Sequence, residues 1–401
     1  MGKKKVFSSI GLLPKEEMLE VKPDFMQLII GVPKESSFQE NRVSLTPDSV
    51  GLLVANGHTI VIEKGAGDSS SFTDKEYSEN GAEIVYSKEE VFKSDLILKI
   101  EPPTKSEIKL MRSNQTLISA VQMSTQKTEY FNELNKKHIS SLGFEFIRDK
   151  QDKLPIVRSM SEIAGNSSLL IASEYLSNTK GGKGLMLGGI TGSIPTNVVV
   201  IGAGTVAEYA CRTALGLGAS VIVFDDSFSK LRRIQNNINQ KISTSSIQPK
   251  VLAKALKRAD VVISAQQVGN GKVPCIVSEE MVVDMKNGAI VIDVSIDQGG
   301  SFETSKLTTH NNPTYVEHDV VHYCVPNITS RVSRTASIAI SNILTPILLI
   351  IAEEGGIGSA IRRYESLRKG VYTFNGYLTN KTLSKNFKIP FKDLNLIMST
   401  L

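Results

Sequence analysis

A glycine-rich turn at Gly202 has the residue types and spacing of a dinucleotide-binding site. An apolar run, 198–201, leads into the turn, and a helical stretch follows it. Gly202 permits a tight turn, Gly204 lets the backbone approach a pyrophosphate, and Ala207 lets the helix pack close to its strand. The first helical N–H groups and the helix dipole attract phosphate. The expected dinucleotide contacts are Gly202, Ala203, Gly204, Thr205 and Val206.

A second apolar run, 221–224, ends at Asp225, which is 21 residues after Gly204. A carboxylate at this place accepts hydrogen bonds from the adenosine ribose and repels a 2′-phosphate. The pattern therefore favours NAD over NADP. The alternative is an α/β domain whose glycines serve packing only.

Apolar runs and helical patterns alternate on both sides of this turn. Strand-like runs occur at Thr59–Glu63, Asp95–Ile100, Thr116–Ala120, Leu142–Ile147, Ala259–Ala265 and Ala289–Val294, with an early helical pattern at Asp48–Asn56. The alternation predicts an α/β protein with two Rossmann-like, doubly wound parallel-sheet domains and a cleft between them. Long helices at Pro155–Ser177 and Thr335–Glu353 would carry the chain between the domains.

The same elements suggest four segments. Residues 1–27 are an N-terminal extension without an assigned role, and 28–154 form the first segment of a substrate domain. Residues 155–334 form the NAD-binding domain with its linking helix, and 335–401 return to the substrate domain.

Composition excludes several classes of protein. The net charge of +5 is mild, and no basic block carries interleaved aromatic residues, so we expect no nucleic-acid partner. Cys211, Cys275 and Cys324 are far apart and form no CxxC, which favours a reducing, cytoplasmic location and no metal site. The apolar stretch 338–352 is short for a membrane span and contains Pro346, so we expect a buried helix and no membrane partner.

Several further segments carry a family pattern. They are Ile30-Gly-Val-Pro-Lys-Glu with Asn41-Arg-Val-Ser-Leu-Thr-Pro, Gly65-Ala-Gly, Met160-Ser-Glu-Ile-Ala-Gly, Asp293-Val-Ser-Ile-Asp-Gln-Gly-Gly, and His318-Asp-Val-Val-His-Tyr-Cys-Val-Pro-Asn. Together with the glycine turn, they resemble the alanine dehydrogenase and transhydrogenase α-subunit family, and alanine dehydrogenase most closely. The resemblance runs from about residue 28 to the C-terminus. It implies oxidative deamination of L-alanine to pyruvate and ammonium, with hydride transfer to NAD. It also implies a homo-oligomer, either a hexamer or a dimer.

The resemblance also implies roles for individual residues. Arg42 matches the arginine that holds the substrate carboxylate, for which its planar fork is suited. Asp297 matches the acid near the nicotinamide ribose and the reacting carbon, and Lys230 matches a basic position near the adenosine end. The positions that match the nicotinamide side are Ser161, Val294, Val325, Asn327 and Ile328.

Two positions depart from the family. Glu101, in Lys99-Ile-Glu-Pro-Pro, stands where dehydrogenases have a substrate-binding lysine, and Gln122 stands where they have a histidine acid or base. Gln122 cannot exchange a proton near neutral pH but can orient a reacting group. Glu101 would repel a substrate carboxylate unless it is protonated or paired, and Lys99 could pair with it if the strand stays regular. The candidate catalytic set is Asp297, Gln122, Arg42, Lys99 and Glu101.

The leading hypothesis is an NAD-dependent amino-acid dehydrogenase acting on L-alanine, with an amino acid or 2-oxo acid as its small-molecule partner. One alternative is a family member with a different amino-acid substrate, since Glu101 could bind an extra amino group. Another is an NAD-binding regulatory protein without catalysis. A third is a transhydrogenase α-type subunit, although those proteins keep the histidine and work with membrane partners.

Overall fold

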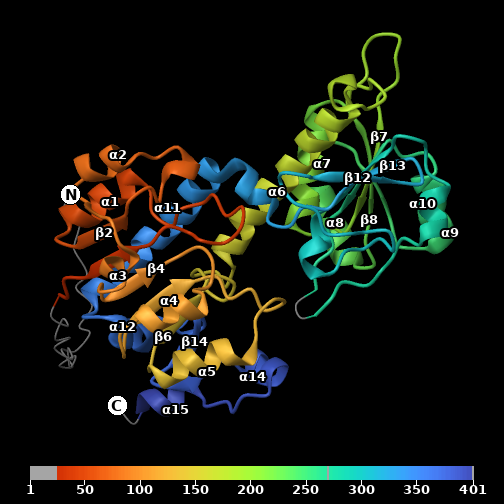
Figure 1. Cartoon of the computed structure of the whole chain (residues 1–401). Coiled ribbons are helices and arrows are strands. Elements are labelled where there is room, and N and C mark those ends of the chain that lie inside the picture. Colours follow the sequence, from red (N-terminus) through yellow and green to blue (C-terminus); the bar gives the residue numbers. More distant parts are fainter. Residues whose placement is uncertain (1–24, 269–270, 400–401) are drawn as a thin grey trace, which may run out of the picture.

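Two sheets organise the chain, each at the centre of one lobe (Figure 1). The structure is a computed structural model that describes residues 25–268 and 271–399. Across the first sheet the strands are β15 (Tyr377–Leu378), β14 (Val371–Phe374), β6 (Ser140–Gly143), β5 (Thr116–Ser119), β4 (Leu96–Leu98), β1 (Ile29–Val32), β2 (Thr59–Glu63) and β3 (Glu83–Val85). Across the second they are β12 (Thr314–Glu317), β13 (Val320–Tyr323), β11 (Ile290–Asp293), β10 (Val261–Ser264), β7 (Asn197–Ile201), β8 (Ser220–Phe224) and β9 (Ser243–Ser245).

Both sheets are wound in the same order. In each, the first strand lies in the middle, the next two lie to one side, and the chain then crosses to the other side. The crossing falls between β1 and β4 in the first sheet and between β7 and β10 in the second. Ligands of doubly wound sheets bind outside the carboxyl ends of the strands at this point. The predicted α/β class with two Rossmann-like sheets is confirmed.

The strands form where β-branched and apolar residues run together. Ile30, Ile60 and Val200 are almost fully buried, as expected for parallel strands covered by helices on both faces. The helices of the first lobe are α1 (Pro47–Ala55), α2 (Asp74–Glu79), α3 (Lys88–Val91), α4 (Lys105–Leu110), α5 (Thr128–Lys136), α12 (Ile357–Arg363), α13 (Glu365–Arg368), α14 (Lys381–Phe387) and α15 (Leu394–Ser399). Those of the second are α7 (Thr205–Gly216), α8 (Phe228–Asn237), α9 (Pro249–Leu256) and α10 (Glu279–Val283), with the short helices η3 (Val294–Gln298) and η4 (Ile328–Val332).

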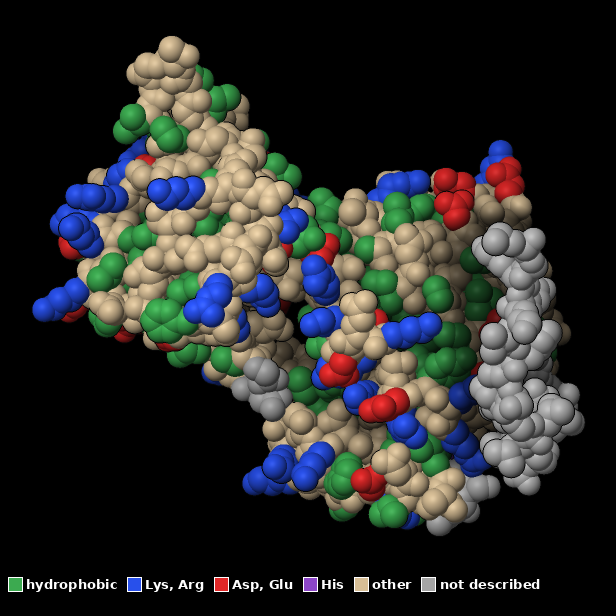
Figure 2. All heavy atoms as spheres, turned by 180° about the vertical axis from the view of Figure 1, so that it is seen from behind, with side chains coloured by type: hydrophobic (Ala, Val, Ile, Leu, Met, Phe, Trp, Pro, Cys, Tyr) green, Lys and Arg blue, Asp and Glu red, His purple; other side chains and the backbone are tan. Residues whose placement is uncertain are grey.

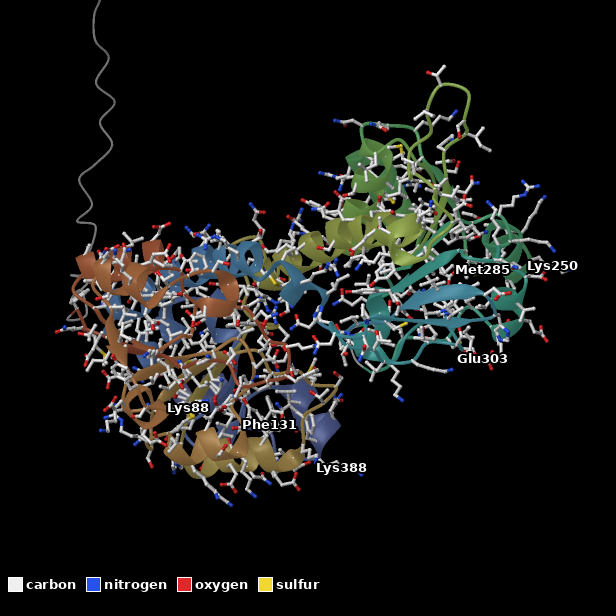
Figure 3. All side chains as sticks on the ribbon, turned by 45° about the horizontal axis from the view of Figure 1, so that its top comes forward. Lys88, Phe131, Lys250, Met285, Glu303 and Lys388 are labelled. Atoms are coloured by element: carbon white, nitrogen blue, oxygen red, sulfur yellow. The ribbon has the colours of Figure 1, made fainter. Side chains whose placement is uncertain are left out.

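Two long helices join the lobes, α6 (Pro155–Leu176) and α11 (Ser333–Glu353) (Figure 1). Helix α6 packs against α7 at Gly165, where a Cβ atom would lie 2.4 Å from the carbonyl oxygen of Val206. Helix α11 buries one face in the core of the first sheet, as Ile340 and Leu344 show. The space-filling view in Figure 2 shows a notch between the two lobes, and Figure 3 shows Lys88 and Phe131 in one lobe and Met285 and Glu303 in the other.

Some boundaries differ from the predictions. The strand predicted at Leu142–Ile147 is wrong at its end, because β6 ends at Gly143 and a turn follows. Strands β12, β14 and β15 are antiparallel to their neighbours, which the periodicity did not indicate. Most of the predicted N-terminal extension, residues 1–24, lies outside the described residues.

One helix in the described ranges, 328–353, is long and apolar enough by composition to cross a membrane. Half of its most apolar window is buried inside the protein. Ile340 and Leu344 of this helix pack in the core of the first sheet.

Candidate active site

Arg42 lies in the loop after β1, with a tenth of its side chain exposed. Glu40 covers one edge of the guanidinium: Nε donates to Oε1 at 2.7 Å and Nη2 donates to Oε2 at 2.5 Å. Nη1 donates to Thr329 Oγ1 of the other lobe at 3.1 Å and contacts the Met160 sulfur at 3.6 Å. A guanidinium has five N–H donors, so Nη2 keeps one more. That group lies 3.8 Å from Oε1 of Glu101.

Glu101 follows β4 and is 8% exposed. Its Oε2 accepts a hydrogen bond from Nε2 of Gln122, and its carboxyl group is in hydrogen-bonding contact with that of Glu40. Burial and then the negative charge of Glu40 raise the pKa of Glu101 to about 8. Burial also opposes the ionisation of Glu40, but the charge and hydrogen bonds of Arg42 outweigh it and hold that pKa below its usual range. Glu101 is therefore the weaker acid of the pair.

Lys99 lies beneath this site and is 1% exposed. Its Nζ lies 2.9 Å from Glu35 Oε2 and 3.4 Å from Glu107 Oε1, while Glu35 Oε1 accepts the N–H of Ile100 at 2.7 Å. Lys99 does not pair with Glu101, as a regular strand would have allowed, because Glu35 and Glu107 bind its ammonium group. Lys99 instead positions the segment that carries Glu101, and a direct catalytic role for it remains a prediction.

Gln122 follows β5 in a turn with left-handed backbone, at φ 53°. Glu145 holds this turn: its Oε1 accepts the N–H of Gln122 at 2.8 Å, and both of its oxygens lie 2.9 Å from the N–H of Val121. Glu145 thus has a structural hydrogen-bonding role here. The turn aims the Gln122 amide at Glu101.

Asp297 and Asn327 come from the second lobe. The side-chain amide of Asn327 donates to Glu40 Oε2 at 2.8 Å, and its backbone N–H hydrogen-bonds the carboxylate of Asp297. Asn327 has a left-handed backbone, φ 52°; its side-chain amide reaches Glu40 of the first lobe, while its backbone N–H stays on Asp297 of the second. Asp297 is open to water in this structure. Desolvation by the surrounding protein atoms raises its pKa to about 6, against the backbone hydrogen bond from Asn327 and the charge of Arg42. Water moderates this effect as long as the carboxylate stays exposed.

His310 joins this group, although the sequence pattern gave no reason to single it out. Its backbone N–H donates to Gln39 Oε1 at 2.7 Å, and its ring interacts with the backbone of Asn327. Burial lowers the pKa of His310, so the ring is neutral near pH 7. Within the part of the chain that the structure describes, its Nε2 is buried and has no hydrogen-bond partner.

The glycine turn after β7 has the predicted geometry. Gly202 has φ +103°, and a Cβ atom there would lie 2.6 Å from the carbonyl oxygen of Ala265. Gly204 caps the N-terminus of α7, and no described atom lies within 4 Å of the place where its Cβ would stand. The N–H of Ala203 donates to Asp225 Oδ2 at 2.7 Å. An open backbone at a helix N-terminus is the feature that a pyrophosphate requires.

Asp225 also holds this turn, because its Oδ1 accepts the N–H of Ser227 at 2.7 Å. Each oxygen keeps a lone pair for a ribose hydroxyl.

The other predicted cofactor positions lie around the same edge of the sheet or on helices. Ser161 donates a hydrogen bond to the carbonyl of Val157 within its own helix at 2.8 Å, and Lys230 is an exposed residue of α8. Val294, Val325 and Ile328 line the carboxyl ends of β11 and β13, together with Asn327. Contacts between these residues and a cofactor remain predictions.

Four other site residues escaped the sequence reasoning: Glu40, Thr329, Glu35 and Glu107. Glu40 is two residues before Arg42, so its proximity was a usable signal. The others contact the site only through folding.

Comparisons with known proteins agree with this arrangement. The family models described as alanine dehydrogenase/PNT match residues 31–164 with the N-terminal domain and 168–381 with the C-terminal domain. This chain belongs to the alanine dehydrogenase/PNT family. Within that family, the alanine dehydrogenase of Methanococcus maripaludis is 38% identical over 91% of this chain and 98% of its own length. That of Mycolicibacterium smegmatis is 36% identical over the same shares.

Two solved structures have the same fold. An L-alanine dehydrogenase structure has a TM-score of 0.84 and 32% identity, and the match covers 90% of this chain and 99% of that one. A transhydrogenase from Sinorhizobium meliloti has a TM-score of 0.76 at 22% identity over 88% and 99%, which shows the fold alone.

Proposed function

We propose that this protein is an NAD-dependent dehydrogenase that converts L-alanine, NAD and water to pyruvate, ammonium, NADH and a proton. The main support is a chain of hydrogen bonds that links the two lobes. Arg42 donates to Glu40, the side-chain amide of Asn327 donates to the same Glu40, and the backbone N–H of Asn327 donates to Asp297. An anion-binding group and an acid on the cofactor side are thus joined by hydrogen bonds. The family of the chain supports the reaction type.

Arg42 would hold the substrate carboxylate along its Nη1–Nη2 edge, in place of the weak contact with Met160. Gln122 would orient the nitrogen or oxygen on the reacting carbon, because its amide can donate and accept but cannot exchange a proton. Asp297 would accept and return protons for water as the substrate nitrogen leaves. Its raised pKa lies near the range where a carboxylate can do both.

The second sheet fits NAD as the cofactor. The open space at Gly204 admits a pyrophosphate, and Asp225 presents a carboxylate where the ribose would lie. Val294, Val325 and Ile328 would border the nicotinamide, with Ser161 and Lys230 further along the cofactor. When bound, NAD supplies the hydride acceptor for the α-carbon of the substrate.

The test is to incubate the purified protein with NAD and a panel of L-amino acids and to follow NADH formation, with pyruvate, ammonium and NADH as the reverse assay. We expect L-alanine to give NADH. The variant Arg42→Met should lose about 2–4 kcal/mol of transition-state binding, roughly 30- to 1000-fold in kcat/KM. Turnover with another amino acid only would change the substrate assignment, and NAD binding without any turnover would reject the dehydrogenase.

The hydrogen bond that the Gln122 amide donates to Glu101 favours a second candidate function, NAD binding without catalysis. Both residues replace groups that the chemistry of the family uses, so an NAD-binding protein without catalysis is consistent with them. A transhydrogenase α-type subunit has weaker support, since the likeness to that structure shows the fold alone.

We also propose that the protein is cytoplasmic and forms a homo-oligomer, a hexamer or a dimer, without nucleic-acid or membrane partners. The exposed apolar side chains of Met186, Ile190 and Ile194 project from the second lobe and would be covered in such an assembly. Sedimentation equilibrium would give the mass. A monomer at assay concentration would contradict this assignment.

A further inference from the structure

We propose that Glu101 acts as a neutral carboxylic acid whose single proton is shared with Glu40 in the free site and is donated instead to the substrate carboxylate held by Arg42 when substrate binds. This inference rests on the proposed function, because it assumes that the site takes a small carboxylate. Glu101 would then donate a hydrogen bond to the substrate carboxylate, as a lysine at this position would, but without a positive charge. It also makes binding of the carboxylate dependent on pH.

The geometry leaves the Nη1–Nη2 edge of Arg42 for an incoming carboxylate. Glu40 fills the Nε–Nη2 edge of Arg42 with bonds of 2.7 and 2.5 Å. The open donor on Nη2 is the one that faces Glu101, at 3.8 Å. A substrate carboxylate bound to this donor must therefore touch Glu101. An ionised Glu101 would repel it, whereas a protonated one would donate an O–H···O⁻ hydrogen bond, among the strongest that proteins form.

The surrounding charges keep the proton on Glu101. From the first lobe, the ionised Glu40 contacts it directly and Glu35 raises its pKa further, while Arg42 acts in the opposite direction. Lys99 does not relieve this repulsion, because it is bound between Glu35 and Glu107. Two further acids lie at the edges of the site: Glu145 holds the turn of Gln122, and Asp297 faces Arg42 from the second lobe, with His310 nearby on the Asn327 backbone.

Binding of an additional substrate amino group to Glu101 is the competing explanation. It requires an ionised Glu101 beside an ionised Glu40, two like charges that share one cation: Arg42 binds Glu40 at 2.5 Å but lies 3.8 Å from Glu101. The neutral acid removes this repulsion. It also keeps the hydrogen bond from Gln122, since a carboxylic acid retains an acceptor oxygen for the amide.

The experiment measures binding of propionate, which has no reactive nitrogen or oxygen at the α-carbon, to the protein–NADH complex by calorimetry. The pH series runs from about two units below pH 8 to about two units above. We expect the affinity of the wild-type protein to be level at first and to fall ~10-fold per pH unit above about 8, as the proton of Glu101 is lost. Glu101→Gln, which has the same shape and a permanent donor, should bind propionate with a level affinity over the upper half of the range.

Two further variants serve as controls. Glu79→Gln removes a carboxylate whose side chain is 63% exposed and should leave the wild-type curve unchanged. Glu40→Gln removes the charge that raises the pKa of Glu101, so the fall in affinity should begin at lower pH. NADH affinity and melting temperature show whether each variant is folded.

A wild-type curve that is level above pH 8, or a Glu101→Gln curve that falls like the wild type, would overturn the proposal. Tighter binding of a diamino acid to the wild-type protein as the pH rises, lost in Glu101→Gln, would also overturn it in favour of an ionised Glu101. Propionate does not react, so these outcomes do not depend on turnover. Failure of every amino acid in the turnover panel, with the expected propionate curves intact, would reject the proposed function alone.

Discussion

The two sheets share one winding order, but the groups they present at the point where the chain crosses over differ: backbone in the second sheet and charged side chains in the first. Beside β7 the second sheet presents backbone: Gly202 makes the turn and Gly204 leaves open space at a helix N-terminus. Beside β1 and β4 the first sheet presents buried charges, with Lys99 held by Glu35 and Glu107 beneath the site. The shared topology fixes where a ligand can bind, and the local chemistry decides which ligand binds.

The difference has a physical basis. A pyrophosphate is recognised by many weak N–H donors, which any backbone offers when side chains stay small. A small carboxylate needs a few strong donors at fixed positions, and these must come from side chains. Fixing such side chains requires further charges underneath, so the first site involves many more residues than the second.

The largest effect is expected from removing the buried ion pairs of Lys99 in the first site. Lys99→Met leaves Glu35 buried without its cation and Glu107 with Lys88 alone, so the free energy of unfolding should fall by about 3–5 kcal/mol. Urea unfolding followed by circular dichroism measures it. The control is Lys88→Met, which removes the other cation bonded to Glu107. The Lys88 side chain is a quarter exposed, so the free energy of unfolding should fall by about 1 kcal/mol or less. Equal losses in both variants would contradict a special role for Lys99.

The glycine turn should respond in a way that separates stability from binding. Gly202→Ala places a methyl group against Ala265 at positive φ and should cost about 1–3 kcal/mol of unfolding free energy. Gly204→Ala should cost less than about 1 kcal/mol, yet weaken NAD ~10-fold or more, because its methyl group enters the space left for the pyrophosphate.

Gly216→Ala, at the end of α7 and also in open space, is the matched control and should leave NAD affinity unchanged. Unfolding curves and NAD titrations of the three variants would be compared. Unchanged NAD affinity in Gly204→Ala would place the cofactor elsewhere.

The smallest effect concerns the choice of cofactor. Asp225→Asn removes the charge that disfavours a 2′-phosphate, so the preference for NAD over NADP should fall ~10-fold, about 1.4 kcal/mol. Titration with both cofactors gives the ratio. Asp284→Asn, an exposed carboxylate on the same lobe, should leave it unchanged. A preference that survives in Asp225→Asn would mean that Asp225 serves only the backbone bonds to Ala203 and Ser227.

The predictions from the sequence were most successful where the interactions are local. The glycine turn, its strand and its helix follow each other within a few residues, so pattern and structure agree at Gly202 and Gly204. The predicted end of β6 was wrong, because its pairing with β5 stops at Gly143. The possible pairing of Lys99 with Glu101 does not form, because Glu35, from another part of the chain, binds Lys99. His310 escaped notice because its only signal is its position beside Asn327.

The sequence by itself determined the fold class, the family and the identity of the two departures, Glu101 and Gln122, since these depend on residue type and order. Tertiary structure decided what those departures face. Glu35 meets Lys99 across 64 residues, and Arg42 meets Thr329 across 287. Charges at such separations come together only when the sheets are complete. Burial then sets their protonation, because desolvation and the nearest charges depend on every element packed around the site.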